Sequence, residues 1–352
     1  MFRIEMLQAN EGDCLILSYG NEHRPKHVVI DGGRMSTWKR LRPRLEQFLA
    51  RGEELELLVV THIDRDHIEG VLGLMEHPDI PQRFGDIWFN GYHHLRNEHV
   101  ERFGVVQGER LTEALVRLKL PWNRHRQWQS GPVALTRSNE PVSAVLDGGL
   151  KLTLLSPSLD QLAKLRGEWE KVCREEGLIA GEAVIERRRV EGLENLGRIN
   201  VDRLAATEFD EDPEKPNGSS IAFIAEYDGR RVLFGADAHP TQLCTALAAL
   251  GARQTLHAMK APHHGSKKNL SLDLLAAVDC RNYLISTGGQ YFNHPDREAI
   301  ARIIKHGGQA PVIVFNYESP ENKIWNSAGL REEWGYTPQY PLVGAESVSI
   351  DL

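Results

Sequence analysis

Residues 55–67 read Leu-Glu-Leu-Leu-Val-Val-Thr-His-Ile-Asp-Arg-Asp-His. The apolar run over 55–60 predicts a buried strand, and polar side chains gathered directly after such a strand are typical of a functional site. Two imidazoles and two carboxylates, all suitable ligands for divalent metals, follow this strand; they are His62, Asp64, Asp66 and His67. Because alternate residues of a tight turn converge, this spacing suits two neighbouring ions. A solvated polar loop is the alternative for this segment alone.

The sequence before this segment predicts a strand meander followed by a helix. Alternating or apolar runs at 2–7, 14–19 and 27–30 predict three strands, and the third ends at Asp31 and two glycines. An amphipathic stretch at 37–49 predicts a helix that Gly52 ends. After the decisive segment, Gly70 would let the following helix approach its neighbours closely.

The sequence after residue 100 changes character. Long charged, helix-favouring stretches dominate to about residue 215, and strand patterns return at 219–227, 231–234, 255–260 and 283–286. We therefore predict four segments. These are the first half of one domain at 1–100, a mainly helical insertion at 101–215, the second half of the domain at 216–318 and a C-terminal extension at 319–352.

The composition bounds the class of protein. With 41% hydrophobic and 26% charged residues in a chain of 352, we expect a globular protein with a substantial core. A net charge of −7 gives no general attraction to nucleic acid. The four cysteines have no CxxC spacing, and no apolar run approaches the roughly 20 residues that a bilayer requires. We expect a cytoplasmic protein with reduced thiols and no membrane span.

The segment at 61–70 resembles the THxHxDHxxG signature of the metallo-β-lactamase superfamily. With Asp64 in place of the second histidine, it is similar to the branch that includes the hydrolase domain of the competence protein ComEC. Six further segments of this chain are similar to motifs of this branch and occur in the same order. With the branch's motif in brackets, they lie at 10–13 (VGQGD), 29–33 (IDGG), 217–220 (N-x-x-S), 234–237 (TGD), 260–266 (K-x-PHHGS) and 294–295 (GHP). The resemblance implies an α/β fold, a four-layer αββα sandwich, with the largely helical insertion outside it.

The resemblance also implies two divalent metal ions, zinc by expectation and manganese as the alternative. Carried over by position, the ligands would be His62, Asp64, Asp66, His67, Asp237 and His264. Asp237 would bridge the ions, and Asp31 would orient a ligand histidine through a hydrogen bond. A turn-capping role is the alternative for Asp31.

One departure from the superfamily concerns the ligand set. Many members place a metal-binding histidine before the serine-led strand, where this chain has Pro216 and Asn217. Asn217, His93 or His94 would then complete the set, although His93 and His94 also suit a structural or surface role. Because oxygen-rich coordination favours harder ions, this departure is the reason for considering manganese.

Two such ions would lower the pKa of a shared water, so that a hydroxide attacks and no protein nucleophile is needed. The sequence accordingly has neither a GxSxG motif nor a P-loop. The catalytic candidates are Asp66, His263, His294 and Lys267. His263 and His294 would contact a scissile phosphate or protonate the leaving group, and Lys267 with Ser266 would offset negative charge. A solvated helix entrance is the alternative for Lys267, and a structural turn for His294.

Three functions remain open from the sequence. The leading one is a phosphodiesterase or nuclease that binds nucleic acid or another phosphodiester, which a basic rim around the site would favour. The second is a hydrolase of small esters, thioesters or lactams, favoured by a closed apolar pocket. The third is a non-catalytic or partner-dependent subunit whose insertion binds another protein. In the insertion, Arg124, Arg126, Trp128 and the arginines at 187–189 could contact a nucleic-acid strand, or simply form an exposed helix face.

Overall fold

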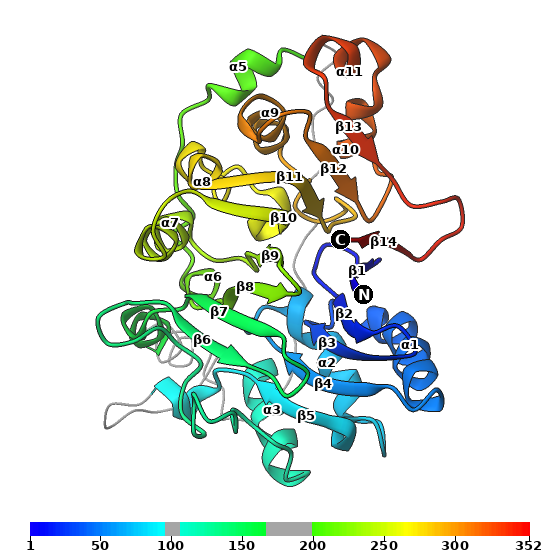
Figure 1. Ribbon diagram of the computed structural model, residues 1–352, viewed down its shortest axis with the longest axis vertical. Coiled ribbons are helices and arrows are strands. Elements are labelled where there is room, and N and C mark those ends of the chain that lie inside the picture. Colours follow the sequence, from blue (N-terminus) through cyan, green and yellow to red (C-terminus); the bar gives the residue numbers. More distant parts are fainter. Residues whose placement is uncertain (96–105, 167–198) are drawn as a thin grey trace.

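The computed structural model describes residues 1–95, 106–166 and 199–352, which form four layers. Two mixed sheets face each other, and helices cover the outer face of each sheet (Figure 1). This arrangement confirms the predicted four-layer αββα sandwich. Among the described residues, no helix combines the length and the apolar character that crossing a bilayer demands.

The first sheet is built mainly from the N-terminal part of the chain. Its strands are β1 (Phe2–Leu7), β2 (Leu15–Asn21), β3 (Arg24–Ile30), β4 (Glu54–Val59), β5 (Phe84–Trp88) and β14 (Ser347–Asp351). Their order is β14-β1-β2-β3-β4-β5. The pairs from β14 to β3 are antiparallel, whereas β3, β4 and β5 run parallel. The two chain ends therefore lie close together (Figure 1).

The second sheet has the order β13-β12-β11-β10-β9-β8-β7-β6. Its strands are β6 (Val142–Val145), β7 (Lys151–Ser156), β8 (Ala222–Tyr227), β9 (Arg230–Phe234), β10 (Gln254–Lys260), β11 (Val278–Ile285), β12 (Val312–Phe315) and β13 (Thr337–Gln339). Strands β9 to β13 run parallel, and β6 to β9 pair antiparallel. Neighbouring parallel strands in each sheet thus end at the same edge.

Apolar side chains fill the three spaces between the four layers. Between the sheets, Ile4 and Leu57 of the first sheet share a core with Phe223 and Leu284 of the second. Helices α1 (Trp38–Ala50), α2 (Arg65–Met75) and α3 (Val106–Arg117) cover the first sheet. The second is covered by α5 (Val201–Ala205), α7 (Pro240–Ala249), α8 (Leu272–Ala277), α9 (Arg297–His306) and α11 (Ala328–Trp334).

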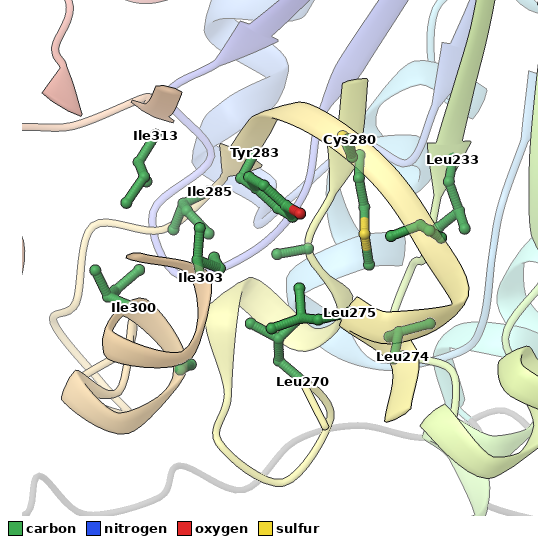
Figure 2. Close-up of a cluster of buried hydrophobic side chains, with 14 of the residues drawn as sticks. Leu233, Leu270, Leu274, Leu275, Cys280, Tyr283, Ile285, Ile300, Ile303 and Ile313 are labelled. Atoms are coloured by element: carbon green, nitrogen blue, oxygen red, sulfur yellow. The ribbon is translucent and has the colours of Figure 1, made fainter. Parts of the chain in front are cut away.

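Shorter helical turns complete the described chain; they are α6 (Lys215–Gly218), α10 (Pro320–Lys323), η1 (Met35–Thr37), η2 (Pro81–Arg83), η3 (Tyr92–Leu95), η4 (Pro262–Gly265) and η5 (Ile324–Asn326). Figure 2 shows the packing beside η4. Leu274 and Leu275 of α8 and Ile303 of α9 lie with Cys280 and Tyr283 of β11 in one buried cluster. This packing holds the loop between β10 and α8 against the second sheet.

The range predicted as a mainly helical insertion, 101–215, contains two strands of the second sheet. Strand β7 pairs with β8, and β6 forms the edge of the sheet beyond β7. The prediction missed them because both strands are short and are followed by a long charged stretch. The C-terminal segment 319–352 likewise adds one strand to each sheet, β13 and β14. The four-segment division itself stays a prediction.

Trp128 does not offer the predicted stacking surface. Its side chain is buried, and its ring lies edge-on against Trp88, with 5.4 Å between the ring centroids. A large apolar side chain in this position contributes to the core between the sheets. Arg124 and Arg126 are exposed, as predicted for a surface, and residues 187–189 lie outside the described part of the chain.

Helix α2 approaches the loop after β3 backbone to backbone. The Gly70 nitrogen donates to the carbonyl of Gly33, and the Gly32 nitrogen donates to the carbonyl of His67, both at 2.8 Å. A Cβ atom at Gly70 would stand 1.9 Å from the Gly32 oxygen. Glycine at position 70 therefore sets the distance between Asp31 and the helix that carries His67.

We expect Gly70→Ala to destabilise the protein by about 1–3 kcal/mol, because the added methyl group forces α2 away from the loop. At a helix position where the added methyl group meets no neighbouring atom, a glycine-to-alanine change instead stabilises the folded protein. A Cβ atom added at Gly329 in α11 would meet no other atom within 4 Å, so Gly329→Ala should stabilise by about 0.5–1 kcal/mol. Urea unfolding with a chelator present measures both. A Gly70→Ala protein as stable as the parent would contradict the close approach.

Candidate metal centre

The predicted ligands lie where strands of both sheets end. In the first sheet, β3 ends one residue before Asp31 and β4 ends shortly before His62. In the second sheet, β9 leads to Asp237, and β10 leads to η4, which carries His264. Open α/β sheets place sites at the carboxyl ends of parallel strands, and here the ends of two sheets meet.

Hydrogen bonds behind the imidazoles of His62 and His67 fix which ring nitrogen carries the proton. Nδ1 of His67 lies 2.8 Å from Oδ2 of Asp31, which is the contact predicted for Asp31. The Thr61 hydroxyl donates its only hydrogen to the same carboxylate at 2.7 Å. The hydroxyl oxygen of Thr61 must therefore accept from Nδ1 of His62, which lies 3.0 Å away. In their neutral forms both rings therefore present an unprotonated Nε2 on the opposite edge.

His264 is held in the same way from the second sheet. Its Nδ1 lies 2.9 Å from the carbonyl oxygen of Ser286, which only accepts, so Nδ1 carries the proton. Its Nε2 lies 3.2 Å from Nε2 of His67. Two nitrogen lone pairs at this distance repel each other unless a proton or a metal ion lies between them.

Carboxylates surround these facing nitrogens. Oδ2 of Asp237 lies 3.3 Å from Nε2 of His67 and 3.5 Å from Nε2 of His264, and Oδ2 of Asp66 is also 3.5 Å from the latter. Burial would lower the pKa of His67, but the carboxylates of Asp237, Asp31 and Asp66 raise it well above its usual value. The surroundings thus favour positive charge here, which fits a bound metal ion.

A second set of donors, from His62 and Asp64, lies near the same oxygen of Asp237. Nε2 of His62 is 3.8 Å from Oδ2 of Asp237 and 3.7 Å from Oδ2 of Asp64. This nitrogen and Oδ1 of Asp237 are buried and have no hydrogen-bond partner. Burial and repulsion from His67 lower the pKa of His62 to about 3, so its ring stays neutral and able to bind a metal. Oδ2 of Asp237 thus lies near imidazole nitrogens of both donor sets, and its bridging role stays a prediction.

His263, predicted as a catalytic residue, also faces Asp237. Its Nε2 lies 3.7 Å from Oδ2 of Asp237, a distance similar to that of His62. The His294 ring lies 5.4 Å from the His263 ring. Nδ1 of His294 is buried without a hydrogen-bond partner. The structure therefore brings both predicted histidines to the rim of the carboxylate and imidazole cluster.

Other predicted residues have structural contacts. The Lys267 ammonium lies 3.0 Å from Oε1 of Glu298, and its backbone nitrogen donates to Asp296. The Ser266 hydroxyl accepts a hydrogen bond from the backbone of Lys268 and shapes the loop. Lys267 and Ser266 thus stabilise the segment after η4, and the charge of Lys267 is offset by Glu298.

The three residues proposed to replace a missing histidine differ in position. Asn217 is buried near the cluster, with its amide nitrogen 2.7 Å from Oδ2 of Asp212. The His94 ring lies edge-on against Trp122, at 4.6 Å between centroids. His93 lies in η3, and its side chain is outside the described part of the structure.

Asp13 belongs to the cluster although the sequence did not single it out as a ligand. It lies within 4.8 Å of donor atoms of His67, Asp237 and His264. Its Oδ1 is 3.3 Å from Nδ1 of His264, and its Oδ2 pairs with the buried ammonium of Lys260. Because these contacts lie on the Nδ1 edge of His264, we place Asp13 behind the imidazole rather than among the metal ligands. The signal available in the sequence was Lys260, because a lysine at the end of a buried strand needs an acidic partner such as Asp13.

No family model matches this chain, and no curated protein does. Among solved structures, the chain is similar to CmlA, a diiron β-hydroxylase from Streptomyces venezuelae, with 13% identity and a TM-score of 0.40. All of this chain is covered, but it spans only 54% of the length of CmlA. It is also similar to YhfI of Bacillus subtilis, described as a metallo-β-lactamase fold protein, with 8% identity, a TM-score of 0.38 and 99% of both chains covered.

These similarities are too weak to carry an argument about chemistry. The fold follows from the sheet order and the four layers, and the possible metal centre follows from its donor atoms. The resemblance to the ComEC branch stays a prediction.

We expect Asp13→Asn to destabilise the protein by about 3–5 kcal/mol, because it leaves the Lys260 ammonium buried without its partner. Lys260→Met should also destabilise, and the double variant should lose less than the sum of the two. Urea unfolding in chelator measures this cycle. Asp351→Asn, which breaks an exposed pair with Arg3, is the control and should cost less than about 1 kcal/mol. Additive effects of Asp13→Asn and Lys260→Met would contradict the coupling.

Proposed function

We propose that this protein is a metal-dependent hydrolase that cleaves phosphodiesters, with nucleic acid as the leading substrate class. The observation that carries the proposal is the set of three imidazoles, His62, His67 and His264, with protons held on their outer edges and Nε2 atoms directed to Asp237. Such a donor set is suited to divalent ions and has no structural need of its own.

The residues that would hold the ions are the six predicted ligands; they are His62, Asp64, Asp66, His67, Asp237 and His264. Divalent ions bound here would lower the pKa of a water molecule and offset charge on phosphate oxygens. A mixture of imidazole and carboxylate donors suits zinc, and the share of carboxylate oxygens keeps manganese as the alternative.

The chain itself supplies groups for substrate at the rim. His294 has a buried Nδ1 without a hydrogen-bond partner, close to His263. Nδ1 of His294 lies 3.6 Å from Oδ2 of Asp296, so the Nε2 edge of the ring is the one that would meet an oxygen of a substrate that reaches Asp237. Asp64 keeps 41% of its side chain exposed, so the His62 side of the cluster opens toward solvent. Substrate would therefore approach from the side of His263 and His294.

Aromatic rings lead from this rim to the surface and support a substrate with nucleobases. The Phe292 ring lies 6.2 Å from the His294 ring, and Phe292 and Tyr291 are 61% and 52% exposed. The Arg34 guanidinium lies over the Tyr291 ring at 5.9 Å. Exposed aromatic side chains beside a cation form the stacking surface that single-stranded nucleic acids use. Both cations near this surface are ion-paired, Lys267 with Glu298 and Arg34 with Glu11, so base stacking on the two aromatic rings carries this support.

Activity on nucleic acid should require the metal ligands. With Zn²⁺ or Mn²⁺ added, we expect the parent to cleave circular or linear DNA or RNA, or an activated phosphodiester. Asp66→Ala and His264→Ala should each lower kcat/KM at least about 100-fold, because each removes a donor from the centre. His306→Ala removes an exposed histidine and should keep parental activity. Equal cleavage rates in the parent, Asp66→Ala and His264→Ala would refute the proposal.

Phe292→Ala should raise KM for a single-stranded oligonucleotide about 10-fold, since stacking one base contributes about 1–3 kcal/mol. For an activated phosphodiester without a nucleobase, kcat/KM should stay within about twofold of the parent. Leu342→Ala removes another exposed apolar side chain, 83% exposed, and is the matched control. An equal loss on both substrates in steady-state kinetics would refute base stacking at Phe292.

A further inference from the structure

The backbone that carries His263 and His264 has an unusual conformation. Both residues have left-handed φ and ψ angles, 46° and 52° for His263 and 56° and 21° for His264. For residues other than glycine this conformation costs about 1–2 kcal/mol each, so surrounding contacts must hold it. The His263 nitrogen donates to the carbonyl of Ala236, and the Ser266 nitrogen donates to the carbonyl of His263, both at 2.8 Å. The turn directs two successive imidazoles toward Asp237.

Two acceptors surround Nδ1 of the His263 ring. Oδ1 of Asn269 lies at 2.9 Å and Oδ2 of Asp212 at 3.2 Å from this nitrogen. Both oxygens accept, so Nδ1 carries a proton, and in the neutral ring Nε2 is left unprotonated. Nε2 is the atom that lies 3.7 Å from Oδ2 of Asp237.

Asp212 also determines how the neighbouring amides are turned. Its Oδ2 accepts from Nδ2 of Asn217 at 2.7 Å and from Nδ2 of Asn269 at 3.1 Å, and its Oδ1 accepts from the Glu214 nitrogen at 3.0 Å. A carboxylate only accepts, so both amides must direct their nitrogens to it. Asn269 then has only its oxygen left for His263. Asp212 is 5% exposed, so water does not compete for these bonds.

We propose that Asp212 is a positioning residue, which acts through His263 by keeping the proton on Nδ1 and Nε2 open toward Asp237, where Nε2 would add a ligand to the six that hold the ions. The inference rests on the proposed function for its catalytic consequence. The loop of Asp212 is joined to the turn by the hydrogen bond from its backbone nitrogen to the carbonyl of Lys268, at 3.2 Å. The residue therefore links the segment before β8 with the loop after β10.

Asp212→Asn tests this role, because an amide in place of the carboxylate can donate to Nδ1 and shift the proton to Nε2. We expect ¹⁵N chemical shifts of His263, measured in chelator, to report the Nδ1–H form in the parent and the Nε2–H form in the variant. In zinc titrations the variant should bind the weaker of two ions about 10–100-fold less tightly, and kcat should fall by a similar factor. Asp210→Asn, an exposed aspartate two residues away, is the matched control and should match the parent.

The outcomes separate this inference from the proposed function. An unchanged His263 tautomer with parental zinc affinity in Asp212→Asn would overturn the positioning role, even in an active enzyme. If the His263 tautomer shifts in Asp212→Asn but the parent protein itself has no hydrolase activity, the positioning role is supported and the proposed function is refuted. If Asp212→Asn does not fold, Asn269→Ala removes the nearer acceptor and keeps the carboxylate. An Nδ1–H form of His263 in that variant would support the role of Asp212, and an Nε2–H form would overturn it, because the carboxylate would then not hold the proton.

Discussion

The structure depends on two imidazole nitrogens that face each other, Nε2 of His67 and Nε2 of His264, 3.2 Å apart. Each ring has its proton on the opposite edge, against Asp31 in one case and the Ser286 carbonyl in the other. When both rings are neutral, neither nitrogen can donate to the other, so a proton or a metal ion between them must stabilise the pair. The surrounding carboxylates, with Asp237 nearest, make this position suitable for a metal cation.

Imidazole nitrogens and carboxylates lose their solvation when they are buried, which costs free energy. The surrounding structure must therefore hold them in fixed positions beside partners that offset this cost. The support comes from both sheets. In the first, the backbone contact of Gly70 with the loop after β3 fixes the helix of His67 against Asp31. In the second, packing of α8 and α9 on β11 holds the loop of His264, whose backbone is left-handed (Figure 2). The buried Asp13–Lys260 pair connects the two sheets behind the centre.

Much of the site could be predicted from short segments of sequence. The donors at 62–67 follow one buried strand, so their proximity depends only on a local turn, and the resemblance supplied Asp237 and His264. The prediction for Lys267 was incomplete, because Glu298 lies thirty-one positions away in sequence and offsets its charge. Trp128 was misplaced for the same reason, since its burial depends on contact with a distant strand.

The sequence by itself determined the fold class, the strand ends that carry polar side chains, and which residue types could bind a metal. The resemblance of the motifs implied the fold class, whereas local periodicity and spacing specify the strand ends and the residue types because these involve neighbours within one turn or strand. Only the tertiary structure decided that Asp13 lies behind His264, that Asp212 holds His263, and that β6 and β7 complete the second sheet. Most of these contacts join residues far apart along the chain, and only the packing of two sheets face to face brings them together.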